Sequence, residues 1–473
     1  MKAMAHLLVA ATQKSSGKTI FTTGLAAALA RRGMAVQPFK KGPDYIDPMW
    51  LGRAAGRPCF NLDFHCMEEA EIIGAFCRRH READISLIET NKGLFDGVDL
   101  QGRDSNAALA ALLGAPVVLV VDTLGVTRGV APLVLGYLNF DTSLRIAGVI
   151  LNKVGGPRHE GKLRAALEYY TNVPVLGAIG RDRALEIPER HLGLVPANEA
   201  DAADAMISRL ADVVASQVDL DRLVTIAGTA EGPRAAPALV AEPARASCGV
   251  RVGIARDAAF GFYYPDDLEG LARAGAELVP FDALRDPSLP PVDGLFIGGG
   301  FPETQMAALE ANRAMRESIR AAIAGGMPTY AECGGLMYLS QSLTWNGETR
   351  EMCGALPGHA VMHHRPQGRG YVVLEETGAG PWSMQPSKTG VPARFPVHEF
   401  HYASLEGLPE DLAFAYRVIR GHGIDGAHDG IVQGNVLASF SHLRDVEGNR
   451  WAARFVNFIR SRNRQQIRQA AAN

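Results

Sequence analysis

Apolar and polar positions in the first 200 residues alternate in the rhythm of a β/α protein. Short apolar runs, which predict buried strands, are separated by longer stretches with helical spacing of apolar residues. We expect strands over His6–Ala11, Ala35–Phe39, Ile85–Glu89, Val117–Asp122, Ile146–Asn152 and Val175–Ile179. Helices are expected between them, for example over Thr19–Arg32 and Gly161–Tyr170. This order predicts an α/β fold with a doubly wound, mostly parallel sheet.

The pattern changes after about residue 215 and then resumes. Residues 216–248 become rich in Ala, Pro, Glu and Gly without a sustained period, which is typical of a linker. A second α/β rhythm then begins, with strands expected over Arg251–Arg256, Glu277–Pro280 and Gly294–Ile297 and a helix over Pro265–Ala274. We therefore predict a first domain over 1–215, a linker over 216–248, a second domain over 249–463 and a polar tail over 464–473, which we expect to be a fraying helix end.

The composition narrows the class of protein. The 473 residues are 47% hydrophobic and 21% charged, which is typical of a soluble globular protein with more than one domain. A net charge of −3 without a basic stripe argues against a nucleic-acid partner. The longest apolar run, Ala115–Val121, is too short to span a membrane, and the six cysteines lack paired spacing. We expect a cytoplasmic protein with no signal peptide, no membrane partner and no disulfide framework.

The segment after the first expected strand has the features of a phosphate-binding loop: Ala11-Thr12-Gln13-Lys14-Ser15-Ser16-Gly17-Lys18-Thr19. Such a loop joins a strand to a helix whose free N–H groups face the phosphates. Lys18 would reach the β- and γ-phosphates, and the Thr19 hydroxyl would bind Mg²⁺. Thr12 stands where the usual pattern has glycine. The alternative is a Ser/Gly-rich turn that caps an ordinary helix.

Carboxylates follow the second and third expected strands. Asp44 and Asp47 lie just past the second strand, and Glu89 ends the third. Because carboxyl ends of parallel strands converge on a ligand crevice, Asp47 and Glu89 can complete a Mg²⁺ shell with Thr19. Asp96, in a glycine-flanked loop, can approach the transferring phosphoryl group. For each of them, a loop carboxylate that caps a helix is an equally good interpretation.

Asn152-Lys153 resembles the start of a guanine-reading NKxD motif. Gly155 occupies the position of its aspartate, which disfavours guanine. Asn152 then either contacts adenine or simply ends its strand. The expected nucleotide-binding residues are Thr12, Ser15, Ser16, Gly17, Lys18, Thr19 and Asn152.

A second candidate site is Tyr330-Ala331-Glu332-Cys333-Gly334-Gly335. Cys333 lies between a strand-like and a helix-like run, and the glycines after it permit a nucleophile elbow. A helix N-terminus favours a thiolate. Gly334, together with Gly299 and Gly300 after another strand, can supply the N–H groups of an oxyanion hole. The alternative for Cys333 is a small buried hydrophobic residue.

A cysteine nucleophile also requires a base, usually a histidine. His442 follows the strand-like run Ile431–Ala438 and is the leading candidate. Its competitors, between which the sequence cannot choose, are His363, His364, His398 and His401.

These segments together resemble the cobyrinate a,c-diamide synthase family, and the resemblance covers nearly the whole chain. The matching segments are Pro38–Pro48, Gly93–Gly97, Pro188–Pro196, Ala255–Phe260, Gly298–Glu303, Tyr330–Gly335 and His398–Tyr402. Each is short, but their order and spacing are specific.

The resemblance implies a ligase that uses glutamine as nitrogen donor. Its first domain would be a P-loop domain similar to dethiobiotin synthetase, and its second a class I glutamine amidotransferase domain of the cobyric acid synthase type. Such a glutaminase uses a Cys–His pair, here Cys333 and His442, without the usual third carboxylate. Thr12 is normal in this family.

The implied chemistry defines cofactors and partners. ATP, with Mg²⁺ bound by Thr19, Asp47 and Glu89, would phosphorylate a tetrapyrrole acetate, and ammonia from L-glutamine would then form the amide. Asp44, Tyr45 and Asp96 look like substrate-binding residues. The sequence leaves the oligomeric state open, with a homodimer as one option.

The chain departs from the family pattern at Glu89-Thr90-Asn91-Lys92-Gly93, where different polar groups would lie beside the substrate. A sirohydrochlorin or siroheme-type ring is therefore an alternative to cobyrinate or hydrogenobyrinate. A glutaminase that serves another ligase is a further alternative. A ParA/MinD-like ATPase switch is disfavoured, because it needs a lysine at position 13, where this chain has glutamine.

Overall fold

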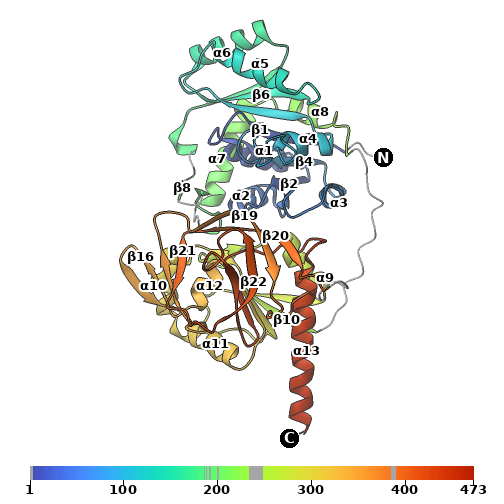
Figure 1. Ribbon diagram of the computed structural model, residues 1–473. Helices are drawn as coiled ribbons and strands as arrows, with labels where there is room; N and C mark the ends of the chain where they lie inside the picture. Colours follow the sequence, from blue (N-terminus) through green and yellow to red (C-terminus); the bar gives the residue numbers. More distant parts are fainter. Residues whose placement is uncertain are drawn as a thin grey trace. The chain divides into compact units, whose positions relative to one another are not determined.

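The computed structural model of the chain describes residues 4–185, 187, 189–190, 193–199, 202–233, 249–384 and 390–472. The chain divides into two compact units, Met1–Val240 and Ala241–Asn473 (Figure 1). Each unit is built around its own large sheet.

The sheet of the first unit has seven parallel strands in the order β3-β2-β4-β1-β5-β6-β7. All six residues of β1 are buried, as expected of a central strand covered on both faces. The strands are β1 (His6–Ala11), β2 (Val36–Lys41), β3 (Phe60–Leu62), β4 (Ile85–Glu89), β5 (Val117–Asp122), β6 (Ile146–Val154) and β7 (Val175–Gly180).

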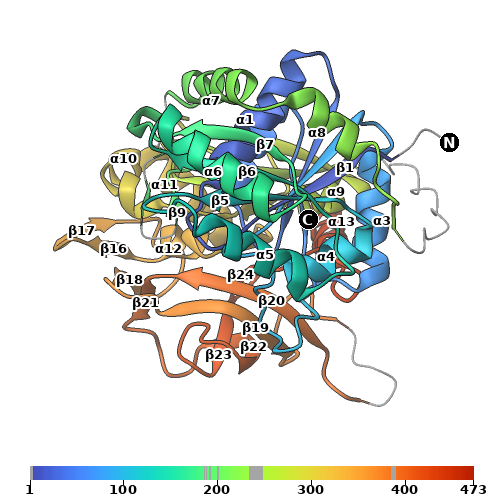
Figure 2. The ribbon, with the colours of Figure 1, turned by 90° about the horizontal axis from the view of Figure 1, so that it is seen from above.

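Helices connect these strands and cover the sheet (Figure 2). Helices α1, α2 and α7 pack against one another. The helices are α1 (Lys18–Arg31), α2 (Ile46–Ala55), α3 (Glu69–His80), α4 (Asn106–Leu113), α5 (Val130–Phe140), α6 (Pro157–Tyr170), α7 (Ala203–Gln217) and α8 (Leu220–Ala227), with a 3₁₀ turn η1 (Arg183–Leu185). A short hairpin pairs β8 (Glu189–Arg190) with β9 (Gly193–Leu194).

The second unit contains a nine-stranded sheet in the order β12-β10-β13-β15-β24-β23-β22-β19-β20. Strands β12 to β24 of this order are parallel and the rest antiparallel. They are β10 (Val250–Ala255), β12 (Ala276–Phe281), β13 (Gly294–Ile297), β15 (Thr329–Glu332), β19 (Gly368–Glu376), β20 (Arg394–His401), β22 (Ala413–Arg420), β23 (His428–Gln433) and β24 (Val436–Ser439).

Two smaller sheets complete the strands of this unit. Their members are β16 (Ser342–Trp345), β17 (Glu348–Glu351), β18 (His359–Met362) and β21 (Ala403–Glu406) in one, and β11 (Phe260–Phe262) with β14 (Gly299–Gly300) in the other. The helices are α9 (Pro265–Arg273), α10 (Met306–Ala311), α11 (Arg313–Ala324), α12 (Gly334–Leu339) and α13 (Trp451–Ala472), with a 3₁₀ turn η2 (Pro302–Gln305).

Two segments differ from the sequence prediction. The expected strand Ile431–Ala438 is a hairpin, because the chain turns at Gly434, which has φ +60°, between β23 and β24. Helix α8 lies within the expected linker 216–248, of which residues 234–248 are outside the described part of the chain. The polar tail continues helix α13 to Ala472, as expected of a helix end.

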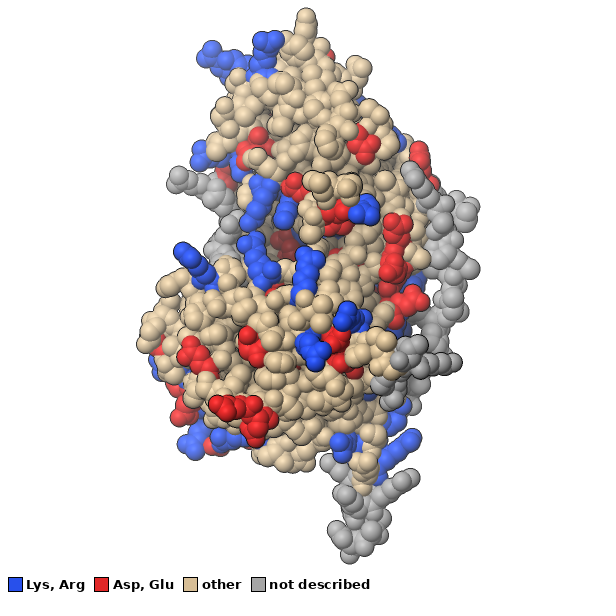
Figure 3. Space-filling model, in the orientation of Figure 1, with Lys and Arg blue, Asp and Glu red and all other residues tan. Residues whose placement is uncertain are grey.

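Charged side chains of both signs lie at the surface of the described residues. On the face shown in Figure 3, acidic and basic side chains both occur on each unit. No helix in the described ranges combines the length and the apolar character that a membrane crossing requires.

Aromatic side chains fill the core of the second unit beneath its sheet. Phe296 is fully buried and stacks on Tyr330 with ring centroids 5.2 Å apart. Trp451 of α13 packs edge-on against Phe296 at 5.3 Å. This cluster joins β13 and β15, whose carboxyl ends carry Gly299 and Cys333, to the last helix.

We predict that Phe296→Ala lowers the free energy of unfolding of this unit by about 3–5 kcal/mol, because it removes a fully buried ring. Ile419→Ala, which truncates a side chain that is 45% exposed on β22, should change it by less than about 0.5 kcal/mol. Denaturant unfolding followed by intrinsic tryptophan fluorescence, in a Trp50→Phe background so that only the tryptophans of this unit report, measures both. Equal losses in the two variants would contradict the assigned core.

Candidate functional site

The loop between β1 and α1 has the backbone shape of a phosphate cradle. Gly17, directly before α1, has φ +87°, which favours glycine. A Cβ at this position would lie 2.1 Å from Asn152 Nδ2. Asn152 donates a hydrogen bond from Nδ2 to the Ser16 carbonyl at 2.8 Å. The end of β6 therefore supports the loop through Asn152, a role that neither interpretation of Asn152 from the sequence included.

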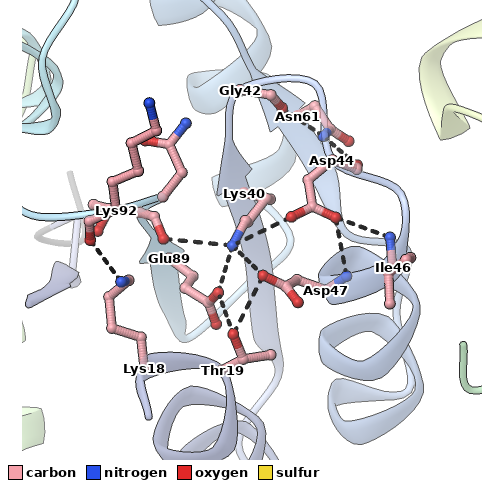
Figure 4. Close-up of polar contacts among 12 residues, drawn as sticks. Lys18, Thr19, Lys40, Gly42, Asp44, Ile46, Asp47, Asn61, Glu89 and Lys92 are labelled. Carbon is pink, nitrogen blue, oxygen red and sulfur yellow. Dashed lines mark hydrogen bonds and ion pairs between the residues drawn. The ribbon is translucent and has the colours of Figure 1, made fainter. Parts of the chain in front are cut away.

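Lys18, the first residue of α1, is almost completely buried and points toward the loop after β4 (Figure 4). Its Nζ donates to the Lys92 carbonyl at 2.6 Å. Burial and the neighbouring Lys40 ammonium lower the pKa of Lys18 to about 8. A bound polyphosphate would favour its protonated form.

The three predicted Mg²⁺ ligands lie together at the carboxyl edge of the sheet. The Thr19 hydroxyl is 3.0 Å from Glu89 Oε1 and 3.2 Å from Asp47 Oδ2. The two carboxylates come from different elements, Glu89 from the end of β4 and Asp47 from the first turn of α2.

Lys40, in β2, is a member of this cluster that sequence reasoning missed. Its ammonium lies among the carboxylates, 2.5 Å from Asp47 Oδ2, 2.6 Å from Glu89 Oε1 and 3.7 Å from Asp44 Oδ2 (Figure 4). Burial alone would lower the pKa of Lys40, but the three carboxylates raise it well above its usual value. Glu89 is fully buried, and this burial raises its pKa.

The donor set fits Mg²⁺. All three expected ligand groups are oxygens, the ligand type that Mg²⁺ prefers. Glu89 Oε2 is buried and has no hydrogen-bond partner within the described part of the chain, so it is available as a ligand. The described residues contain no group of three or more His, Cys, Asp or Glu side chains placed to hold a metal alone. Phosphate oxygens would complete the shell.

The expected substrate-binding residues occupy the same edge of the sheet. Asp44 Oδ1 accepts hydrogen bonds from the backbone N–H groups of Ile46 and Asp47 and so caps α2, while Oδ2 faces Lys40. Tyr45 is largely buried. Asp96 is exposed and accepts a bond from Gly93 N at 2.9 Å, in the loop that packs against the Thr12 carbonyl.

Cys333 lies in a strained turn between β15 and α12. Its φ of 47° and ψ of −102° are unusual for a residue with a side chain. The Cys333 N–H donates to the Ser439 carbonyl of β24 at 2.7 Å, which fixes the turn. Such a turn is typical of a nucleophile elbow.

The glycines expected in the oxyanion hole surround this turn. A Cβ on Gly334 would lie 3.1 Å from Gly300 N, and one on Gly299 would lie 2.9 Å from His442 Cε1. A Cβ on Gly300 would lie 2.0 Å from the Ala259 carbonyl oxygen, which leaves no room for a side chain there. The three glycines bring two backbone segments close to the turn that carries the thiol.

His442 is the histidine that the fold brings to Cys333. A hydrogen bond joins the two side chains, and His442 Nδ1 lies 3.3 Å from Glu332 Oε2. Burial alone would lower the pKa of His442, but its contacts with Cys333 and Glu332 raise it to about 10. The ring also stacks on His398 with centroids 4.9 Å apart.

The other candidate histidines have different surroundings. His398 Nδ1 lies 3.1 Å from the Tyr264 hydroxyl. His363 Nε2 lies 2.8 Å from Ser404 Oγ, and His401 Nδ1 lies 2.8 Å from the Ala403 carbonyl. His364 is exposed. His398 therefore supports the His442 ring, His363 and His401 have hydrogen-bond partners elsewhere, and His364 lies at the surface.

Two family models match the chain, one in each unit. Residues 7–195 match the CobQ/CobB/MinD/ParA nucleotide binding domain, and residues 251–448 match the CobB/CobQ-like glutamine amidotransferase domain. A cobyrinate a,c-diamide synthase of Magnetococcus marinus is 50% identical over 461 residues, which cover 97% of each chain. The chain belongs to the cobyrinate a,c-diamide synthase family.

Two further members of the family have the same full-length match. The synthase of Methanosarcina acetivorans is 42% identical and covers 93% of this chain and 92% of its own. That of Listeria innocua is 40% identical, with 93% and 96% coverage. The predicted family, the α/β fold of both domains and the class of enzyme, a glutamine-dependent ligase, are confirmed.

We predict that Gly17→Ala weakens ATP binding by about tenfold or more, because the new methyl would displace Asn152 and strain the cradle. Calorimetric titration with ATP measures the affinity. Gly161→Ala in α6, where a Cβ meets no atom within 4 Å, is the matched control and should bind normally. Normal binding by both variants would contradict the placement of the phosphates.

Proposed function

We propose that the chain amidates the a- and c-acetate side chains of cobyrinate or hydrogenobyrinate, with ATP and glutamine as co-substrates. The full-length relatives are named cobyrinate a,c-diamide synthases. The observation that carries the proposal is the presence of two complementary sites. Thr19, Asp47 and Glu89 converge beside Lys18 in one unit, and His442 contacts Cys333 in the other.

In the second unit, the Cys333 thiolate attacks the carboxamide carbon of glutamine. The C–S bond forms as the carbonyl oxygen becomes an oxyanion, which the N–H groups of Gly300 and Gly334 stabilise. His442 gives a proton to the departing nitrogen. Ammonia departs, and the glutamyl group remains bound to Cys333 as a thioester. Water then hydrolyses the thioester to glutamate and restores the thiolate.

In the first unit, an acetate oxygen attacks the γ-phosphorus of ATP and ADP departs. The product is an acyl phosphate, which accepts ammonia readily because phosphate is a good leaving group, whereas a carboxylate is a poor electrophile. The Lys18 ammonium and the N–H groups at the start of α1 stabilise charge on the phosphates. Amide formation then releases inorganic phosphate.

Mg²⁺ would be held by Thr19, Asp47 and Glu89, and when bound it neutralises charge on the transferring phosphates. Lys40 keeps Asp47 and Glu89 close together through its own contacts with both. Asp44 and Asp96, at the same edge of the sheet, help to position the acetate.

A panel of tetrapyrrole acids tests the substrate. Glutamine-dependent ATP hydrolysis should be stimulated by cobyrinate or hydrogenobyrinate, and mass spectrometry should count two amide groups per product. Preferential amidation of a sirohydrochlorin-type ring would replace the proposed substrate and retain the chemistry. No stimulation by any macrocycle would remove the tetrapyrrole proposal.

We predict that Cys333→Ala lowers glutamine-dependent amidation by about a thousandfold or more, because the nucleophile is lost. Amidation from a high concentration of ammonium salt should stay close to the wild-type rate. Cys353→Ala, which removes another buried thiol of the same unit, should retain both activities. Loss of both activities in the Cys333 variant would contradict the division of labour between the two sites.

We predict that Lys18→Ala lowers synthesis from both nitrogen donors by about a hundredfold or more, because it removes a cation from the transferring phosphate. Parallel assays with glutamine and with ammonium salt measure this loss. Lys14→Ala removes an exposed lysine of the same loop and should have little effect. Ammonia-driven synthesis at the normal rate in the Lys18 variant would contradict the phosphate site.

A further inference from the structure

Glu332, the residue directly before Cys333, is a buried carboxylate. Its exposed fraction is 1%, and it ends β15. Oε1 accepts hydrogen bonds from the Tyr330 hydroxyl at 2.5 Å and from Leu443 N at 2.9 Å. Oε2 lies 3.3 Å from His442 Nδ1. One oxygen is thus anchored to the fold while the other faces the imidazole.

We propose that Glu332 is a positioning residue for glutamine hydrolysis, which holds His442 with Nδ1 protonated and Nε2 directed to the thiol. This inference rests on the roles proposed above for Cys333 and His442. The family resemblance implied a Cys–His pair without a third carboxylate. Here the residue next to the nucleophile supplies that carboxylate.

The anchoring of Glu332 explains why it can act on the ring. A carboxylate with free rotation would turn toward any donor, but the bonds to Tyr330 and Leu443 fix its plane. His442 is fixed from another direction, because its backbone N–H donates to the His398 carbonyl at 2.9 Å and its ring stacks on that of His398. With Nδ1 beside Glu332, only Nε2 remains for the contact with Cys333.

The charges around His442 favour an imidazolium. The titratable groups that face it in the described residues are Cys333, Glu332 and His398, of which the first two can be anionic. A buried cation between two acidic groups is stabilised by both, and loss of either charge leaves it less stable. The carboxylate therefore supports the protonated form that donates to the departing nitrogen.

We predict that Glu332→Gln, which keeps the size of the side chain, lowers kcat for glutamine hydrolysis by about a hundredfold or more. KM for glutamine should change by less than about threefold, since the side chain does not contact the substrate. Ammonia-driven amidation, which does not use this site, should stay normal and reports that the chain is folded.

The pH profile separates a positioning role from a structural one. In the free enzyme, contacts with Cys333 and Glu332 raise the pKa of His442 to about 10, so wild-type kcat/KM, which reports the free enzyme, should fall only as the pH approaches that value. Removal of the carboxylate charge should move this fall to lower pH in Glu332→Gln. The amino group of glutamine titrates equally in assays of the wild-type protein and of Glu332→Gln. The difference between their two pH profiles therefore reports the titration of the enzyme.

Tyr330→Phe is the matched control. It removes one hydrogen bond to Oε1 and leaves the charge and Oε2 in place, so kcat should fall by less than about tenfold and the profile should not shift. A purely structural role of Glu332 predicts similar effects of the two substitutions.

A measurement on the wild-type protein does not depend on any Glu332 variant being folded. In ¹⁵N-histidine spectra at pH 8, which is below the raised pKa of His442, the ring signal that His442→Gln removes should be that of an imidazolium with protons on both Nδ1 and Nε2. A ring unprotonated at Nδ1 overturns the inference, and so does unchanged kcat with an unchanged profile in Glu332→Gln. Either result would leave the role of Cys333 intact, whereas normal glutamine use by Cys333→Ala would remove the proposed function itself.

Discussion

A buried ammonium surrounded by carboxylates organises the phosphate end of the first unit. Lys40 is 2% exposed and contacts Asp47 and Glu89, which would otherwise face each other without a counter-charge. Removing one member of such a cluster leaves an uncompensated buried charge, so the loss of any one residue would destabilise the whole cluster. Three elements, β2, β4 and α2, thereby meet at one point, and Thr19 at the start of α1 lies beside it.

The second unit also compensates buried charged groups with one another, although the residues differ. Glu332, His442 and Cys333 are all buried, and each has a partner that can compensate its charge. In both units the charged groups lie at the carboxyl ends of parallel strands, where side chains from neighbouring strands converge. The strands are apolar along most of their length, and the chemistry is confined to their last residues and the turns that follow.

Much of this arrangement could be predicted from the sequence. The bounds of β1, β4, β5 and β13 coincide with the apolar runs, because a buried parallel strand reads as a continuous apolar segment. The two strand-to-helix turns before Lys18 and at Cys333 could also be located, since their glycines and their place after a strand are local signals, while the roles assigned to these turns remain proposals.

Lys40 and Glu332 could not be assigned in the same way. A lysine within a strand or a glutamate at its end usually indicates a solvated position, and only the pairing of distant segments shows that these two are buried. The prediction of one strand over Ile431–Ala438 was wrong for a related reason. The composition of this segment is strand-like throughout, and only a turn at a single glycine divides it into two strands. The sequence pattern specifies local backbone states, whereas partners across the sheet depend on tertiary contacts.

The contacts of Lys40 have a consequence for the catalytic cycle. Asp47 and Glu89 both contact the Lys40 ammonium within the folded chain, so the two carboxylates do not have to be brought together in each turnover. Under the proposed function, a divalent ion that enters with its nucleotide would meet two acidic groups that Lys40 already holds at contact distance. The cluster of Lys40, Asp47 and Glu89 is assembled once, when the chain folds.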